Sequence, residues 1–287
     1  MTPVRRLLVG ILAIGLLVAP AVGQTPPRRL VSIVPALTET LFAIGAGPRV
    51  VGVGSFDTHP AEVHDRPRVG GLLDPDMEQI LALTPDLVVL HQSQLDQIAQ
   101  LGRAGIAVFP YVHGGLDDTL DTIRALGAAT GDGPAADRLA DRIASRLDRI
   151  RTRVAGRRRP RVMLVFGREP GSLRNVYASG GFGFLHDMLA AAGGENVFAD
   201  TRRESVQLTS EAILTAAPEV ILELSYDERM TADRQDAERA VWRRLPGVPA
   251  VRTDRVHLLL GNQFVQPGPR LADATEAMAR TLHPEAF

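Results

Sequence analysis

Three histidines of the chain have the chemistry to meet a metal or a polar ligand. They are His59, His91 and His113, and each lies beyond the end of a different apolar run. An imidazole can be an axial ligand to iron or cobalt held in a macrocycle, or it can donate to a ligand carbonyl. We assign no direct metal site and take His59 as the candidate axial ligand. A solvated polar side chain is the alternative interpretation of all three.

Aromatic and polar side chains gather in the same kind of position, although aromatic residues make up only 5% of the chain. Rings beyond apolar runs favour a flat, apolar ligand packed on them, and the alternative is that some are core residues beneath the loops. Arg168, Arg174 and Arg229 are suited to pair with ligand carboxylates, or they are solvated at the surface. The predicted ligand-binding residues are Pro35, Phe56, His59, His91, Tyr111, His113, Arg168, Tyr177, Phe182, Tyr226, Asn262 and Phe264.

Apolar runs that alternate with helical patterns must position these side chains. The expected strands are Leu30–Val34, Val50–Val53, Leu87–Leu90, Val108–Tyr111, Val162–Phe166, Val220–Leu224 and Val256–Leu260. The expected helices between them include Thr38–Ile44, Met77–Leu83, Gln94–Ala104 and Leu116–Leu126. Uniformly apolar strands predict parallel sheets covered on both faces. Ligands meet such sheets at the loops after the carboxyl ends of the strands, where the candidate residues lie.

One phrase occurs twice in the sequence. Glu78 opens a short helical stretch that ends at a proline and continues into an apolar strand, and Glu211 does the same 133 residues later. The strands that begin near Arg29 and Arg161 repeat at almost the same offset, 132 residues. This offset is far longer than the repeat of a solenoid, so it predicts duplication into two similar lobes.

An amphipathic segment between the two halves predicts a long connecting helix. Leu139, Ile143, Leu147, Ile150 and Val154 form an apolar stripe at helical spacing. Some 22 residues would make a rod of roughly 33 Å, long enough to cross both lobes. The expected fold is therefore two Rossmann-like α/β lobes, with mainly parallel sheets, joined by one long rigid α-helix. The expected segments are a signal peptide (1–23), an N-terminal lobe (24–130), the connecting helix (131–159) and a C-terminal lobe (160–287).

The first residues have the pattern of a secretory signal peptide. Arg5 and Arg6 precede an apolar run of about a dozen residues, too short to span a bilayer, and cleavage is expected near Gly23. The alternative is an uncleaved anchor. The chain contains no cysteine, so we expect a periplasmic monomer that is not a lipoprotein. A net charge of −1 argues against nucleic acid as a partner.

The motifs of common hydrolases and nucleotide-binding enzymes are not found in the sequence. It lacks a Gly-x-Ser-x-Gly elbow, a His-Glu-x-x-His pair, a Walker phosphate loop and a cysteine nucleophile. We therefore expect a protein that is not an enzyme. A secreted enzyme, a sensor that signals to a receptor and a binder of bare zinc or manganese remain alternatives.

Several segments together resemble the periplasmic substrate-binding proteins of cobalamin and ferric-siderophore ABC importers, in the helical-backbone metal receptor superfamily. They are Ser32–Gly45, Val51–Gly54, the repeated glutamate phrase, Gly193–Phe198 and Pro267–Arg270, and the similarity runs from Leu30 to Pro284. The resemblance implies that a cobalt or iron chelate binds in a shallow cleft between the lobes. It also implies delivery to a permease dimer with its ATPase, membrane contact only through that permease, and no intrinsic cofactor.

The resemblance also gives the repeated glutamates a role. Glu78 and Glu211 match the positions that dock into arginine pockets of a two-fold permease in that family. A carboxylate in the first turn of a helix is favoured by the helix dipole and can accept a bidentate arginine. The alternative is that each glutamate only stabilises its own helix, by about 0.3 to 1 kcal/mol.

The chain departs from the best-known cobalamin binders in its tryptophans. Those proteins carry tryptophan in the loop before each glutamate phrase, whereas Gly70–Asp74 and Arg203–Gln207 contain none. The single tryptophan is Trp242. The ligand therefore stays open: a corrinoid such as cobalamin ranks first, a ferric siderophore second and haem third.

Overall fold

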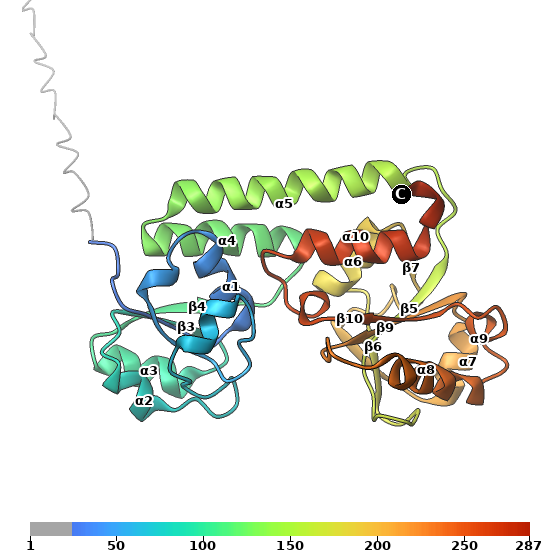
Figure 1. Ribbon diagram of the computed structural model, residues 1–287, viewed down its shortest axis with the longest axis horizontal. Coiled ribbons are helices and arrows are strands. Elements are labelled where there is room, and N and C mark those ends of the chain that lie inside the picture. The colour runs from blue at the N-terminus through green and yellow to red at the C-terminus, as the bar shows by residue number, and fades with distance from the viewer. Residues whose placement is uncertain (1–24) are drawn as a thin grey trace, which may run out of the picture.

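The first lobe is built on a sheet of four parallel strands in the order β2-β1-β3-β4 (Figure 1). The structure is a computed structural model that describes residues 25–287, so the expected signal peptide lies outside the described residues. The strands are β1 (Leu30–Ser32), β2 (Val50–Val53), β3 (Leu87–His91) and β4 (Ala107–Tyr111). The helices are α1 (Pro35–Ala43), α2 (Met77–Ala82), α3 (Leu95–Arg103) and α4 (Leu116–Thr130), with short 3₁₀ turns at Gly47–Arg49 and Ala61–Asp65.

The second lobe has a larger sheet in the order β10-β9-β5-β6-β8, with β7 beside β5. Its strands are β5 (Arg161–Gly167), β6 (Val176–Ser179), β7 (Glu195–Asn196), β8 (Ser205–Leu208), β9 (Val220–Ser225) and β10 (Val256–Leu260). Its helices are α6 (Phe184–Ala191), α7 (Ser210–Ala216), α8 (Ala232–Val241), α9 (Pro249–Arg252) and α10 (Leu271–Leu282), with 3₁₀ turns at Trp242–Arg244, Asn262–Phe264 and Pro284–Ala286.

The two α/β lobes with mainly parallel sheets confirm the expected fold class, with one exception in the second sheet. Strands β6 and β8 run antiparallel to their neighbours and were not expected. Each has only four residues, and polar residues alternate with apolar ones in both. Such short, partly polar segments carry little strand signal in a sequence.

The expected long helix is α5 (Gly133–Val154), and its apolar stripe is buried. It does not stand alone between the lobes, because α4 of the first lobe and α10 of the second both pack against it (Figure 1). One apolar core runs from Leu30 in the first lobe through Leu147 of α5 to Leu282 in the second. Arg146 of α5 also pairs with Asp273 of α10 at 2.6 Å. The lobes are therefore joined by a packed helical layer, which resists bending more than a single helix would.

Among the described residues, none of the helices has both the length and the apolar character needed to cross a membrane.

Candidate ligand-binding site between the lobes

A pocket of about 270 Å³ lies where the two lobes meet. We call it the inter-lobe pocket, and its lining residues are His113, Phe166, Phe182, Gly183, Phe184, Leu185, Glu204, Ser205, Tyr226 and Val265. His113 follows β4 in the first lobe, and Tyr226 follows β9 in the second. The carboxyl ends of parallel strands thus meet here, as expected for a ligand site in α/β sheets.

Four rings form a continuous chain that runs from the first lobe into the second and lines this pocket with its last two members, His113 and Phe184. His91, Tyr111, His113 and Phe184 contact one another edge to face, with successive centroids 5.8, 5.8 and 5.1 Å apart. The last contact crosses from the first lobe to helix α6 of the second. The chain fixes the orientation of His113, because each ring edge meets the face of the next.

Of the two ring nitrogens of His113, Nε2 is the one available to a ligand. The other, Nδ1, lies 2.9 Å from the Tyr111 hydroxyl, whereas no protein group within residues 25–287 bonds to Nε2. Burial lowers the pKa of His113, while the Glu204 carboxylate acts in the opposite direction and His91 adds to the lowering. Burial, followed by the nearby Glu204 carboxylate, raises the pKa of Tyr111. A neutral imidazole held this way can accept a hydrogen bond or coordinate a chelated metal.

Two further hollows adjoin the inter-lobe pocket and share lining residues with it. One, of about 460 Å³, shares His113 and Phe182 and extends along β4 and α4. The other, of about 280 Å³, shares Phe166 and Tyr226 and extends along β5 and β9. We call the three together the cleft. Together these hollows offer a large, flat molecule more space than the inter-lobe pocket alone.

Large apolar side chains are exposed at the walls of the cleft. Phe182 is 55% and Tyr226 60% exposed, although both are side chains that normally bury most of their area. Two other expected residues, Phe56 (70% exposed) and Tyr177 (38% exposed), line none of the three hollows, although the Tyr177 ring lies 6.5 Å from the Phe166 ring. Exposed rings that line a groove between two lobes are typical of a binding surface.

The structure places several of the expected ligand-binding residues elsewhere. The Arg168 side chain is only 2% exposed and pairs with Glu223 at 2.8 Å and Glu238 at 2.9 Å. It also lies over the ring of buried Trp242, with its Cζ 5.9 Å from the centroid. Its charge is therefore neutralised inside the second lobe, although it borders one hollow of the cleft.

Asn262 and Phe264 belong to the seam between the lobes rather than to the pocket. Asn262 is buried and donates from Nδ2 to the Thr58 hydroxyl of the first lobe at 2.8 Å. Phe264 is buried in the shared apolar core. Both residues were predicted to bind ligand because they follow β10. The contact between the two lobes is formed at that same end of the strand, so their side chains are used there instead.

The remaining expected residues lie at the edges of the site. Pro35 is the first residue of α1 and is half-buried. His59 is exposed in the loop after β2 and lines none of the three hollows. His91 is half-buried at the end of β3, with its Nδ1 2.7 Å from the Ser93 hydroxyl. Of the three histidines, the structure thus brings His113, rather than His59, into the pocket.

Sequence reasoning missed Glu204, Phe166 and Val265, which line the inter-lobe pocket. Glu204 lies within Arg203–Gln207, the stretch before the second glutamate phrase that the sequence analysis compared with cobalamin binders. Its place in that stretch was the signal that could have identified it as a candidate ligand-binding residue. Within residues 25–287, no three histidine or carboxylate side chains converge to hold a bare metal ion.

A buried ion pair ties the lobes together beside the cleft. The guanidinium of Arg270 donates from Nε to Glu39 Oε2 at 2.8 Å and from its second nitrogen to Glu39 Oε1 at 2.5 Å. The Glu39 side chain is only 5% exposed. At a second contact between the lobes, Asp187 of α6 accepts from the backbone N–H of Leu116 in α4 at 3.0 Å. The bidentate pairing of Arg270 with Glu39 fixes the relative position of these two partners.

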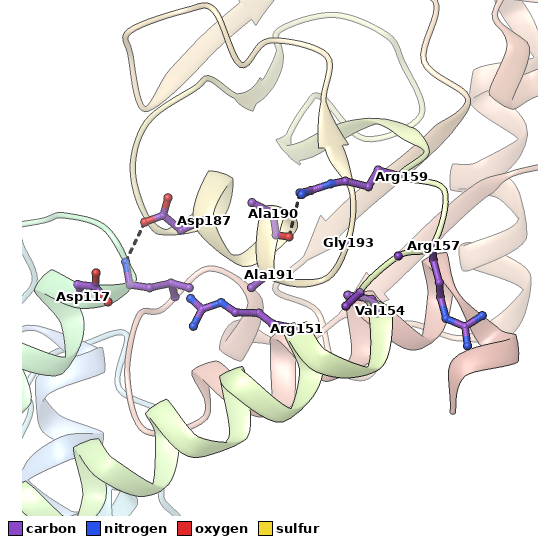
Figure 2. A pocket seen from close by; sticks show the side chains of 12 residues that line it. Asp117, Arg151, Val154, Arg157, Arg159, Asp187, Ala190, Ala191 and Gly193 are labelled. Carbon is purple, nitrogen blue, oxygen red and sulfur yellow. Dashed lines mark hydrogen bonds between the residues drawn. The ribbon is translucent and has the colours of Figure 1, made fainter.

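A larger hollow of about 510 Å³ lies beside the end of α5 and is distinct from the cleft (Figure 2). Its arginines are already engaged: Arg157 pairs with Glu285 at 2.9 Å, and Arg159 donates to the Ala190 carbonyl at 3.0 Å. Its described lining residues include no aromatic side chain. It therefore suits a flat, apolar ligand less well than the cleft does.

Glu78 and Glu211 occupy equivalent places in the two lobes. Each is exposed in the first turn of a short helix, α2 and α7 respectively, and both helices lie on the side away from α5 (Figure 1). Each helix begins with a capping side chain, Asp76 in the first lobe and Thr209 in the second. Hydrogen bonds from its own backbone N–H and from the Thr209 hydroxyl lower the pKa of Glu211.

Comparison with known proteins places this architecture in a family. The family model described as periplasmic binding protein matches residues 30–261. A Bacillus subtilis protein, named an uncharacterized ABC transporter substrate-binding lipoprotein, is 30% identical over 266 residues, or 91% of this chain and 82% of the relative. A Salmonella typhimurium vitamin B12-binding protein is 33% identical over 196 residues, or 68% of this chain and 71% of that protein.

A solved structure shares the fold over nearly its whole length. It is a periplasmic heme-binding protein from Roseiflexus sp. RS-1 in apo form, with a TM-score of 0.76 and 26% identity, covering 91% of this chain and 99% of that chain. The chain therefore belongs to the periplasmic binding protein family, whose members bind solutes for ABC transporters and are not enzymes.

Proposed function

We propose that this protein captures a metal chelate in the cleft and delivers it to the permease of an ABC importer, with a corrinoid such as cobalamin as the favoured ligand. The observation that carries the proposal is the inter-lobe pocket, where His113 of the first lobe faces Phe182 and Tyr226 of the second. Because each lobe contributes rings to the pocket, the two lobes can pack against both faces of a large, flat chelate. A packed helical layer behind them keeps the walls at a fixed separation.

The ranking of ligands rests on two kinds of support. The Salmonella typhimurium relative is named as a vitamin B12-binding protein, and the Roseiflexus structure as a heme-binding one. Both ligands are flat macrocycles that hold a metal, and His113 offers an imidazole nitrogen toward such a metal. A ferric siderophore and haem are the alternatives within the same importer class.

The proposed partner is a two-fold permease with its ATPase. The protein would dock onto the permease through Glu78 and Glu211. Two exposed carboxylates in matching first turns of the two lobes suit two matching arginine pockets. We further propose a periplasmic monomer exported by a cleavable signal peptide and not held by a lipid. Although the Bacillus subtilis relative is named a lipoprotein, this sequence has no cysteine to carry a lipid.

The test is a calorimetric titration of the protein with cyanocobalamin, haem and a set of ferric siderophores. We expect cyanocobalamin to bind with a Kd below about 10 µM. Phe182→Ala removes an exposed ring from the pocket wall and should weaken binding about tenfold, the value of one aromatic contact. Leu214→Ala is the matched control, because Leu214 is also an exposed apolar side chain of the second lobe but lines none of the three hollows.

Binding of free zinc or manganese without binding of any chelate would refute the proposed function. Tighter binding of haem or a ferric siderophore than of cyanocobalamin would replace the favoured ligand with that alternative. Equal losses in Phe182→Ala and Leu214→Ala would show that the chelate does not bind in the cleft.

A further inference from the structure

The inter-lobe pocket contains a single charged side chain, Glu204, among the residues that line it. The other members of the lining are aromatic, aliphatic, glycine, serine and the imidazole of His113. Glu204 is exposed, so water partly screens its charge, but its carboxylate stands among apolar lining residues and acts on a ligand bound beside it.

The fold places the Glu204 carboxylate in the pocket by two local constraints. Its backbone carbonyl accepts from the N–H of Gly180 at 3.0 Å, which anchors the residue immediately before β8. Its side chain lies over Gly183, where an added Cβ would come within 3.3 Å of the Glu204 Cγ. From this position the Glu204 carboxylate acts on two residues of the first lobe. It raises the pKa of Tyr111 and opposes the lowering of the pKa of His113 that burial causes.

The surroundings do not neutralise this charge. Among residues 25–287, six carboxylates and two arginines line the cleft: Asp118, Asp121, Glu204, Glu223, Asp227, Glu238, Arg168 and Arg234. Both arginines already form ion pairs, Arg168 with Glu223 and Glu238, and Arg234 with Asp227. Glu204 itself forms no ion pair within residues 25–287, and the exposed arginines Arg203 and Arg229 line none of the three hollows. The described lining of the cleft is therefore net acidic, and Glu204 is the carboxylate that lines the inter-lobe pocket itself.

The candidate ligands differ in the charge of their edges. Haem carries two propionates and a catecholate chelate of iron is anionic, whereas a corrinoid presents neutral amides whose N–H groups can donate to a carboxylate. We propose that Glu204 is a specificity-determining residue that rejects chelates with carboxylate edges and accepts those with neutral amide edges. This inference rests on the proposed function, because it requires that a metal chelate binds in the cleft.

The experiment compares ligands that differ only in charge. Cyanocobalamin is titrated beside its monocarboxylic acid, in which one amide is hydrolysed, and haem beside its dimethyl ester. We expect the native protein to bind the neutral member of each pair more tightly, by on the order of tenfold for like charges in a partly screened groove. In Glu204→Gln this ratio should fall to about twofold or less, because the amide keeps the shape and removes the charge.

Glu62→Gln is the matched control, because Glu62 is an exposed glutamate that lines none of the three hollows and should leave each ratio unchanged. Thermal unfolding of both variants shows that they are folded. If a chelate binds but Glu204→Gln leaves the ratio as in the native protein, the inference fails while the proposed function stands. If neither member of either pair binds but a ferric siderophore does, the inference fails while the proposed function stands with that ligand. If no chelate binds, both fail.

Discussion

The buried carboxyl of Asp57 gives the protein a stability that depends on pH. Asp57 follows β2 near the seam and is 1% exposed, and neither of its carboxyl oxygens has a hydrogen-bond partner of normal geometry in the part of the chain that the structure describes. The hydroxyl of Thr38, which acts on the Asp57 carboxyl, already donates to Ser32 at 2.8 Å. Burial raises the pKa of Asp57 to about 7, against smaller lowering effects from Thr38, Gly54 and Arg68, and Glu39 adds a further increase.

The sign and size of the effect follow from linkage. Between the ordinary pKa of 3.8 and the folded value of about 7, the native state binds more protons at Asp57 than the unfolded chain does. The free energy of unfolding therefore falls as the pH rises through this window and changes no further above it. These two pKa values give a loss of roughly 2 to 3 kcal/mol between pH 5 and pH 8.

Asp57→Asn removes this titration while keeping a neutral side chain of the same shape. We expect urea unfolding to show how the free energy of unfolding changes from pH 5 to pH 8 in each protein. The decrease should be roughly 2 to 3 kcal/mol smaller in the variant than in the native protein. Asp65→Asn, which changes an exposed carboxyl, should follow the native protein. The reasoning is refuted if the free energies of unfolding of the native protein and Asp57→Asn change in parallel over this range.

Three further predictions concern the seam, the helical layer and docking. Arg270→Met leaves the buried Glu39 carboxylate unpaired and should cost about 3 kcal/mol in urea unfolding, whereas Arg151→Met breaks an exposed pair and should cost less than about 1 kcal/mol. Leu147→Ala opens a cavity under α5 and should cost about 2 to 5 kcal/mol by the same measurement; a cost below about 1 kcal/mol would show that α5 is not part of a tight core. The double variant Glu78→Ala, Glu211→Ala should bind ligand normally but abolish importer-dependent uptake, and undiminished uptake would contradict the docking role.

The fold was predictable from sequence where elements are long or strongly apolar. Strands β2 and β10 begin and end where the apolar runs predict, and the buried stripe of α5 was readable from its spacing. Strands β6 and β8 were not, because four residues with alternating polarity give no clear signal. The packing of α10 on α5 was also not expected, since a helix pattern shows which face is apolar but not which element covers it.

The candidate site was predictable in its location but only partly in its members. The rule that ligands meet the carboxyl ends of parallel strands selected His113, Phe182 and Tyr226, which line the inter-lobe pocket. The same rule selected Arg168 and Asn262, which the fold uses for internal pairing. A residue type in a loop shows which chemistry is available, and only its neighbours decide whether that chemistry is directed at a ligand or at the protein.

Two α/β lobes, a long amphipathic helix between them and a glutamate in the same place in each lobe can all be inferred from the residues in order. These features depend on local periodicity and on a repeat, which are properties of the chain alone. Three other features follow only from the folded arrangement: which imidazole lines the pocket, which arginines are neutralised and that Glu204 supplies the pocket's charge. Those outcomes depend on contacts between residues far apart in the chain, such as His113 with Phe184 and Glu39 with Arg270. Local patterns do not specify such contacts, because they are fixed only when the two lobes pack against the shared helical layer.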